Sequence, residues 1–397
     1  MRDTRIDVIR ALILLSIFIN HVPQNPLEFL THKNFGLSDA AEAFVLISGL
    51  SAGLAYSSKF RPGTILISTL KAWRRAGVLY IAQLCTTLFT IGSFGFFAAH
   101  WMRPDLMEKI AIGPLMQNPA EGFAGIVLMT HQLGYNNILS IYVVMLLMLP
   151  PMILIGKRSI GAMVGLSFAL WLGAGLFQFG PPNWPMEGVW FLNPLSWQFL
   201  FFIGAAAIMH NRAGGTLSRH PALIALAAGY VLLALFWVRV PLWGVDVSFG
   251  LPKVMTGFNK TFLSTFRLLH VLAMAYLIVS VAPLSRLFRR DPANPLAVMG
   301  RHALPVFIAG TLFAMVLQPL RMVVPLAPIQ DAGIVIAGSG MLFALAYWLD
   351  FYGRLNRSAA KPAAPANAGT GSLIARPELP PSRQSVYALE REAESLK

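Results

Sequence analysis

The sequence is poor in cysteine and in charged side chains. Its one cysteine, Cys85, stands in an apolar run, which excludes an intramolecular disulfide and a Cys-x-x-Cys metal or redox site. Its eight histidines show neither a His-Glu-x-x-His motif nor mixed His/Cys spacing, so we expect no metal site. Charged residues make up only 12% of the 397 positions, against 56% hydrophobic residues. This balance excludes an ordinary soluble domain and predicts a membrane protein.

Long apolar stretches recur along the chain up to about residue 355. Ten of them are long enough to cross, or nearly cross, a hydrocarbon core about 30 Å thick at 1.5 Å per helical residue. We therefore predict an all-α fold, a polytopic integral membrane bundle of about ten transmembrane helices. The predicted segments are residues 5–23, 40–57, 75–98, 136–155, 160–178, 195–210, 222–239, 265–284, 303–324 and 332–352.

Basic residues predict the orientation of the bundle. If the N-terminus is cytoplasmic, 23 of the 31 lysines and arginines fall on the cytoplasmic side, in agreement with the positive-inside rule. Both termini are then cytoplasmic, and the net charge of +14 follows from the topology. Because the basic residues are divided among short loops, we expect a lipid bilayer around the protein and no nucleic-acid partner.

The first apolar segment, residues 5–23, carries three ionisable side chains on one stripe. At about 100° per residue, Arg10 and His21 fall within roughly 20° of one another on a helix, and Asp7 precedes Arg10 by three positions. His21 would lie roughly 16 Å along the axis from Arg10. Ionisable groups aligned in a membrane helix usually face an internal cavity. Alternatively, Arg10 reaches the headgroups and His21 ends the segment before Pro23.

Six motifs are spread along the membrane part of the chain. They are Asp7-x-x-Arg10 followed by ten residues and His21, Phe44-Val-Leu-Ile-Ser-Gly-Leu50, Asn137-Ile-Leu-Ser-Ile-Tyr-Val-Val144, Phe191-Leu-Asn-Pro-Leu-Ser-Trp-Gln198, Arg267-Leu-Leu-His270 and Gly300-Arg-His-Ala-Leu-Pro-Val-Phe307. In this order, across about residues 5–355, they resemble the OpgC family of the membrane acyltransferase-three superfamily. The signature of that superfamily is an arginine, ten residues and a histidine. The chain departs from the family pattern at Ser140, where a proline is expected.

The resemblance implies a domain organisation and an activity. Residues 1–355 would form an OpgC-like membrane acyltransferase domain, and residues 356–397 a disordered cytoplasmic tail. The domain would lie in the cell inner membrane as a multi-pass O-acyltransferase, similar to the succinyltransferase that modifies osmoregulated periplasmic glucans. The donor would be cytoplasmic acyl-CoA (succinyl-CoA or acetyl-CoA), a co-substrate, with no bound cofactor. The acceptor would be a periplasmic glucan or another extracytoplasmic glycan.

The stripe on the first segment suits such a transfer. Arg10, near the inner face, would hold an anionic part of the donor, because a guanidinium pairs bidentately with phosphate or carboxylate. His21, toward the outer face, would take the proton of the acceptor hydroxyl. Asp7 would orient Arg10 and offset its charge. Glu42, at the outer end of the second segment, would either orient His21 or be an ordinary loop acid.

Other polar side chains are candidates for substrate binding. Ser48, next to Gly49, either supplies a hydroxyl to the cavity or allows close helix packing. Arg267 and His270 form an i,i+3 pair that we expect to face inward, because a charged side chain facing lipid is costly. His302, at an inner helix end, is more typical of an interfacial residue than of a catalyst. The other candidates are Asn137, Tyr142, Asn193, Trp197 and Gln198, of which Trp197 alone fits core packing better.

Two predicted outer loops, residues 99–135 and 179–194, are rich in groups that bind sugars. Their aromatic rings can stack on sugar faces, and their amides can hydrogen-bond sugar hydroxyls. Trp184 and Trp190 would fit an interfacial aromatic belt equally well. The loops therefore allow an acceptor site without requiring one.

The alternative function is that of a polytopic transporter or flippase for a glycan or small molecule. Helices with prolines and buried charges would serve it as well. A transporter usually shows two related halves, and residues 1–178 and 195–355 show no clear correspondence. An acyltransferase consumes acyl-CoA and a transporter does not, so that measurement separates the two classes.

Overall fold

The computed structural model describes residues 3–240, 242–245, 248 and 250–359. Apart from one isolated bridge between Pro182 and Val189, these residues form helices joined by turns and loops, which confirms the predicted all-α fold for this part of the chain. The chain divides into two compact units, Met1–Tyr352 and Gly353–Lys397. The features that follow belong to the first unit, apart from residues 353–359 at the end of the last helix. The predicted tail over 356–397 lies almost wholly outside the described residues.

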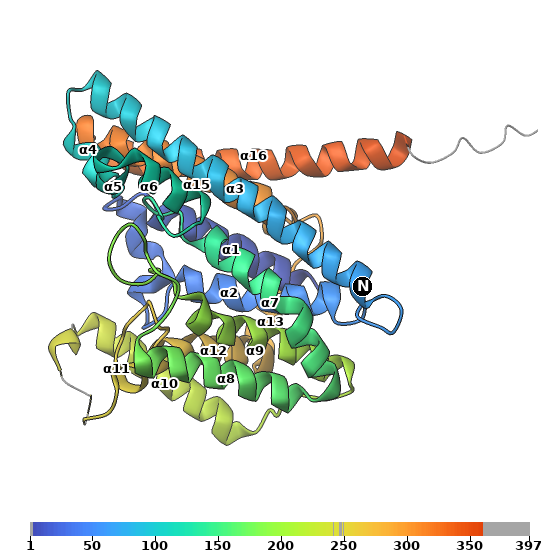
Figure 1. Ribbon diagram of the computed structural model, residues 1–397. Helices are drawn as coiled ribbons and strands as arrows, with labels where there is room; N and C mark the ends of the chain where they lie inside the picture. The colour runs from blue at the N-terminus through green and yellow to red at the C-terminus, as the bar shows by residue number, and fades with distance from the viewer. Residues whose placement is uncertain (1–2, 241, 246–247, 249, 360–397) are drawn as a thin grey trace, which may run out of the picture. The chain divides into compact units, whose positions relative to one another are not determined.

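Nine of the ten apolar segments predicted from the sequence coincide with one helix each, and the tenth, residues 265–284, runs past the end of its helix at Ser280 into a second one. Figure 1 shows their course, with α3 running beside α7 and α15. The ten helices are α1 (Thr4–Asn20), α2 (Ala40–Tyr56), α3 (Ile65–His100), α7 (Ile138–Arg158), α8 (Ile160–Phe177), α9 (Pro194–Arg212), α10 (Pro221–Arg239), α12 (Thr265–Ser280), α15 (Ala303–Val323) and α16 (Pro328–Ala359). The shorter helices are α4 (Asp105–Glu108), α5 (Gly113–Gln117), α6 (Pro119–Val127), α11 (Lys253–Thr256), α13 (Ala282–Phe288) and α14 (Pro295–Arg301), with single turns at Pro26–Leu30, His32–Asn34 and Leu242–Gly244.

Six described helices are long and apolar enough to cross a membrane: α3, α7, α8, α10, α15 and α16. A seventh span is possible if α12 and α13, which meet at an angle of 93°, act as one. The multi-pass membrane character is therefore supported, while the count of ten stays a prediction. α1 and α2 have only 17 residues each, and α1 also carries the charged side chains of Arg5, Asp7 and Arg10.

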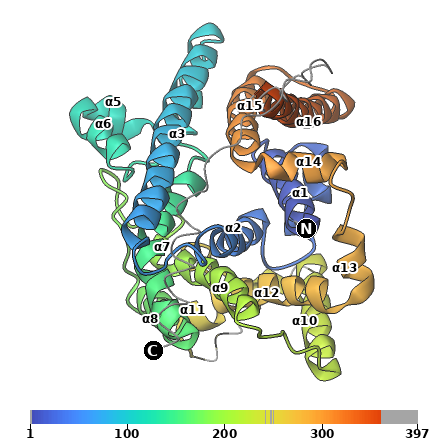
Figure 2. The same ribbon diagram turned by 90° about the vertical axis from the view of Figure 1, so that its right-hand side faces the viewer.

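α2 lies between α1 and α9 (Figure 2), and glycines let it approach α9 closely. A Cβ atom on Gly49 of α2 would lie 1.9 Å from the carbonyl oxygen of Phe201. A Cβ atom on Gly204 of α9 would lie 2.5 Å from the carbonyl oxygen of Leu46. Only hydrogen fits at these two positions, which is the small-residue packing typical of membrane helices.

α1 makes a similar contact with α14, just before the chain breaks and continues as α15. A Cβ atom on Gly300 would lie 1.8 Å from the Asp7 carbonyl oxygen. The break falls at His302, which follows the last residue of α14 and precedes the first residue of α15. This arrangement brings the Gly300–Phe307 motif against the stripe of ionisable residues on α1.

Candidate functional site

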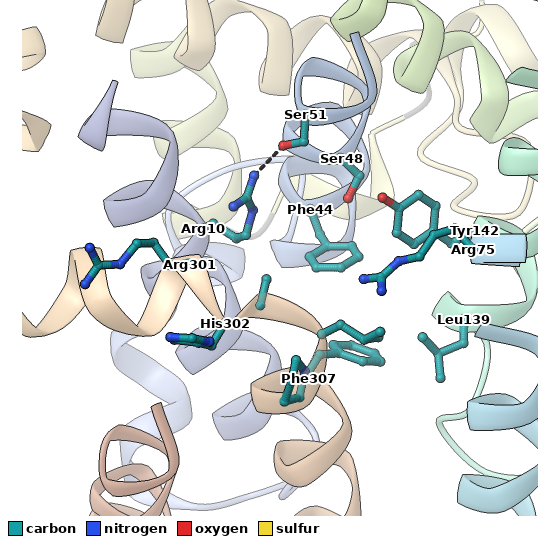
Figure 3. A pocket seen from close by; sticks show the side chains of 13 residues that line it. Arg10, Phe44, Ser48, Ser51, Arg75, Leu139, Tyr142, Arg301, His302 and Phe307 are labelled. Carbon is teal, nitrogen blue, oxygen red and sulfur yellow. Dashed lines mark hydrogen bonds between the residues drawn. The ribbon is translucent and has the colours of Figure 1, made fainter. Parts of the chain in front are cut away.

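A cavity of about 360 Å³ opens between α1, α2, α3, α7 and the start of α15 (Figure 3). Cationic, hydroxyl and apolar side chains share its wall, which suits a ligand with both charged and apolar parts. The lining residues are Arg10, Phe44, Ser48, Ser51, Arg75, Leu139, Tyr142, Arg301, His302, Ala303, Leu304, Pro305 and Phe307.

Arg10 is fixed in this cavity by three oxygen atoms. Its Nη1 donates to Asp7 Oδ1 (3.2 Å) and to the carbonyl oxygen of Gly300 (3.0 Å). Its Nη2 donates to the Ser51 hydroxyl. Asp7 is only 2% exposed, so its carboxylate is held away from solvent beside the guanidinium. The predicted i,i+3 pair of Asp7 and Arg10 therefore exists and orients Arg10.

Arg75 and Tyr142 reach the same cavity from the side opposite Arg10 (Figure 3). Tyr142 and Ser48 both line this cavity, and the charge of Arg75 acts on the Tyr142 hydroxyl. Among the described residues, no hydrogen bond or ion pair engages the guanidinium of Arg75. Of the three arginines that line the cavity, Arg10 pairs with Asp7 and Arg301 with Asp350 (3.4 Å), which leaves Arg75 available to an anionic ligand.

A second, narrower cavity adjoins the first and shares Leu139 and Phe307 with it. Its other lining residues are Gln83, Tyr135, Asn136, Ile138 and Thr311. It has no room for a water molecule in this structure, and Leu139 and Phe307 form the part of its wall that it shares with the wide cavity.

His21 lies beyond the narrow cavity, at the end of α1 opposite Arg10. Its ring stacks on Tyr135, with 5.0 Å between ring centroids and 27° between the planes. Its Nδ1 is buried and has no hydrogen-bond partner in the described part of the chain. α15 fixes the turn that carries His21, since Gln318 donates to the His21 carbonyl oxygen and Arg321 to that of Pro23.

Comparison with known proteins identifies the family. The family model described as OpgC protein matches residues 2–354. The chain belongs to the OpgC family. The resemblance predicted from the six motifs is thereby confirmed, whereas membership of the wider acyltransferase superfamily stays a prediction. No curated protein and no solved structure matches the chain.

A network of four charged residues lies near His21 in this OpgC family member. The Glu42 carboxylate, 0% exposed, accepts from Arg267 Nε (2.6 Å) and from the backbone N–H of Asp39 (2.9 Å). Asp39 also pairs with Lys260 and with Arg267. Burial alone would raise the pKa of Asp39, but Lys260 and Arg267 outweigh it and hold that pKa below its usual range.

Glu42 therefore has two structural roles: it helps to begin α2, and it joins α2 to α12 through Arg267. It completes a capping box with Asp39, which begins the helix. The charged groups that act on the His21 ring are Lys260 and Asp39. A direct role for Glu42 in orienting His21 stays a prediction, with no contact between the two side chains among those described.

His270, predicted to bind substrate, fixes a loop instead of lining either cavity. Its Nδ1 lies 2.8 Å from the Ser38 hydroxyl and accepts from the Ser38 backbone N–H at 3.3 Å. A Cβ atom on Gly36 would lie 2.1 Å from the His270 ring, so the chain between α1 and α2 packs tightly on α12. Within the described ranges, no cluster of three or more His, Cys, Asp or Glu could hold a metal ion.

Asn193, Trp197 and Gln198 are completely buried and line neither cavity. Asn193 caps α9, accepting from the Leu195 N–H (3.0 Å), and Trp197 Nε1 donates to the Lys260 carbonyl oxygen (3.0 Å). The Gln198 side chain bonds both the hydroxyl (2.5 Å) and the carbonyl oxygen (2.8 Å) of Ser167. Their polar groups are committed to the fold, and their substrate-binding role stays a prediction.

Of the predicted residues, the structure brings Arg10, Ser48 and Tyr142 together in the wide cavity, with Asp7 behind Arg10. Asn137 lines neither cavity, but its neighbour Asn136 lines the narrow one. The sequence reasoning missed the roles of Ser51, Gln83, Tyr135 and Asn136. Arg75 and Arg301 are two of the basic residues behind the predicted topology, and both also line the wide cavity, as does His302, for which the sequence predicts an interfacial position.

One sequence signal for the narrow cavity was present in α3. Gln83, Thr86, Thr87 and Thr90 recur at helical spacing within an otherwise apolar segment, and all four are buried. Polar residues on one face of a membrane helix mark a packed interface or a pathway. That pattern would have directed attention to Gln83.

Proposed function

We propose that this OpgC family member is an O-acyltransferase that moves an acyl group from cytoplasmic acyl-CoA to a hydroxyl of a periplasmic glucan or another extracytoplasmic glycan. The observation that carries the proposal is the layout of α1. This helix places Arg10 in a cation-lined cavity and ends at His21, with a narrow cavity between the two. Transfer across a membrane needs a donor held at one end and a base at the other.

The side chains have separable roles in this reaction. Arg10 and Arg75 bind anionic groups of the donor from opposite sides of the wide cavity. His21 accepts the proton of the acceptor hydroxyl while the hydroxyl oxygen attacks the thioester carbonyl carbon. The carbon–sulfur bond then breaks, and the thiolate of CoA leaves and takes up that proton. Tyr135, stacked on the ring, orients His21.

This reaction implies an orientation of the protein in the membrane. Arg10 would face the cytoplasm, where acyl-CoA is made, and His21 the periplasm, in the cell inner membrane. Both termini would then be cytoplasmic. Succinyl is the acyl group expected from the family, with succinyl-CoA as co-substrate and no bound cofactor.

The test is a transfer assay with purified protein in lipid vesicles. Labelled succinyl-CoA and acetyl-CoA are each supplied with the periplasmic glucan fraction of the host, and the glucan is analysed by mass spectrometry. We expect acylated glucan from the wild type and none from His21→Ala at equal protein abundance. His131→Ala is the matched control, because His131 lines neither cavity and lies in the loop before α7. Acylation by His21→Ala at the normal rate would rule out the general-base role.

The transporter alternative rests on one observation, the 93° bend between α12 and α13, since broken helices are common in transporters. The same vesicle assay distinguishes a transporter from an acyltransferase. A transporter would move glycan across the membrane without consuming acyl-CoA, and no mass would be added to the glucan.

A further inference from the structure

Two buried amide side chains line the narrow cavity between the wide cavity and His21. Gln83 of α3 is 3% exposed, and Asn136, in the loop before α7, is 4% exposed. Gln83 Nε2 donates to the backbone carbonyl oxygen of Asn136 (2.7 Å). Asn136 Nδ2 donates to the Leu133 carbonyl oxygen (3.0 Å) and to the Thr90 hydroxyl (2.8 Å). Because each nitrogen faces a carbonyl oxygen, the orientation of both amides is fixed.

The amide oxygens of these two residues are left without partners. Gln83 Oε1 and Asn136 Oδ1 are buried, and neither accepts a hydrogen bond from any described residue. Buried polar atoms in folded proteins are nearly always hydrogen-bonded, so an unpartnered one calls for an explanation. Two such acceptors at one cavity indicate a ligand that brings N–H or O–H donors to it.

The position of the cavity narrows the class of ligand. On one side it shares Leu139 and Phe307 with the cavity that holds Arg10 and Arg75. On the other side it includes Tyr135, which stacks on His21. A ligand passing through is therefore anionic at one end and reactive at the other, with hydrogen-bond donors on an otherwise apolar arm between them.

We propose that Gln83 and Asn136 bind the secondary-amide N–H groups of the donor's pantetheine arm, each amide oxygen accepting one hydrogen bond. This assignment rests on the proposed function. The apolar side chains of Leu139, Ile138 and Phe307 face the methylene groups between the amides. Since the cavity holds no water-sized space in this structure, the arm enters by displacing Leu139 and Phe307.

The test compares acyl-CoA substrates that differ by a single amide N–H group. Succinyl-CoA is used beside two full-length analogues, in each of which one pantetheine amide N–H is replaced by an ester oxygen. For the wild type we expect kcat/KM to favour succinyl-CoA over each analogue by about tenfold, because a buried acceptor built for N–H is left unpaired by the ester. Gln83→Leu and Asn136→Leu should each lose the preference against one analogue.

The matched control is Gln132→Leu. Gln132 also has a buried Oε1 without a described partner, but it lines neither cavity. The preference is a ratio measured within one sample, so it does not depend on how much of a variant folds. The proposal is overturned if the wild type shows no preference, if both cavity variants keep it, or if Gln132→Leu loses it. If the wild type does not use succinyl-CoA at all, the proposed function fails too. That result can be told apart from the loss of preference alone, in which acylation still occurs.

Discussion

At the scale of single residues, the two ends of α1 should fail in different ways when changed. Arg10→Lys keeps the charge but loses the planar fork that meets Asp7, Gly300 and Ser51. We expect the donor KM to rise about tenfold to a hundredfold, as for the loss of a charge-assisted pair, with kcat nearly unchanged. His21→Gln should lower kcat by about 10²–10⁴-fold and leave donor binding intact.

Titration of acyl-CoA against both variants measures the difference. An Arg10→Lys enzyme with normal donor dependence and a collapsed kcat would show that Arg10 acts on the transition state or on helix packing. The assignment of Arg10 to the donor would then have to be withdrawn.

Arg75 offers a second test of the wide cavity. Arg75→Gln removes the cation that lies in the cavity without a described hydrogen-bonding partner, and we expect the donor KM to rise about threefold to tenfold. The adjacent Arg74→Gln is the control, since Arg74 does not line the cavity. Equal donor KM values for the two variants would mean that Arg75 contributes only to the general surface charge.

The sequence could predict Asp7, Arg10 and His21 because all three lie on one helix, where spacing fixes the shared face. It could not predict the surroundings of Asn193, Trp197 and Gln198. The local sequence around a buried polar side chain at a helix start is the same whether that side chain binds a substrate or bonds a distant part of the chain. The partners of Trp197 and Gln198, Lys260 and Ser167, are 63 and 31 residues away, and only the fold brings them together.

At the scale of elements, the packing of α2 on α9 rests on two glycines. Gly49→Ala would place a Cβ atom 1.9 Å from the Phe201 carbonyl oxygen, so the helices must move apart. We expect a loss of about 1–3 kcal/mol in the free energy of unfolding, as for overpacking of a core. Thermal unfolding of the purified protein in detergent measures it.

Gly92→Ala on α3 is the matched control, because its Cβ atom would meet nothing within 4 Å. It should leave the unfolding temperature unchanged or raise it slightly, since alanine favours helix. If Gly49→Ala were as stable as Gly92→Ala, the helices would have to be farther apart than described.

At the scale of the whole molecule, the ten apolar segments were predictable because hydrophobic length alone identifies them. The breaks were not predictable in the same way. The stop at His302 follows the contact of Gly300 with α1, which no local pattern encodes. The bend between α12 and α13 has a local signal in Pro283, but the sequence does not give its angle. The depth of each segment in the bilayer decides how many of the ten span it, and cysteine labelling of the loops measures this.

Cysteine labelling in a Cys85→Ser background tests the topology. Asn118→Cys, in the predicted outer loop, should react with a membrane-impermeant maleimide added to intact spheroplasts. Arg61→Cys, between α2 and α3, should react only after lysis. The reverse pattern would invert the orientation, and His21 would then face the cytoplasm.

Arg10 is also a mechanical link. It bonds the Gly300 carbonyl oxygen two residues before the break at His302, and α15 then carries Phe307 to the point where the two cavities share a wall. A donor that draws Arg10 away from Gly300 therefore loosens the start of α15, and we expect the occupied state to be the open one. Binding and opening are thermodynamically linked, so a change that favours opening must also favour binding. Phe307→Ala removes the side chain at that point. We therefore expect the donor Kd to fall by the factor with which the bound donor favours opening. An unchanged donor Kd in Phe307→Ala would show that binding and opening are independent.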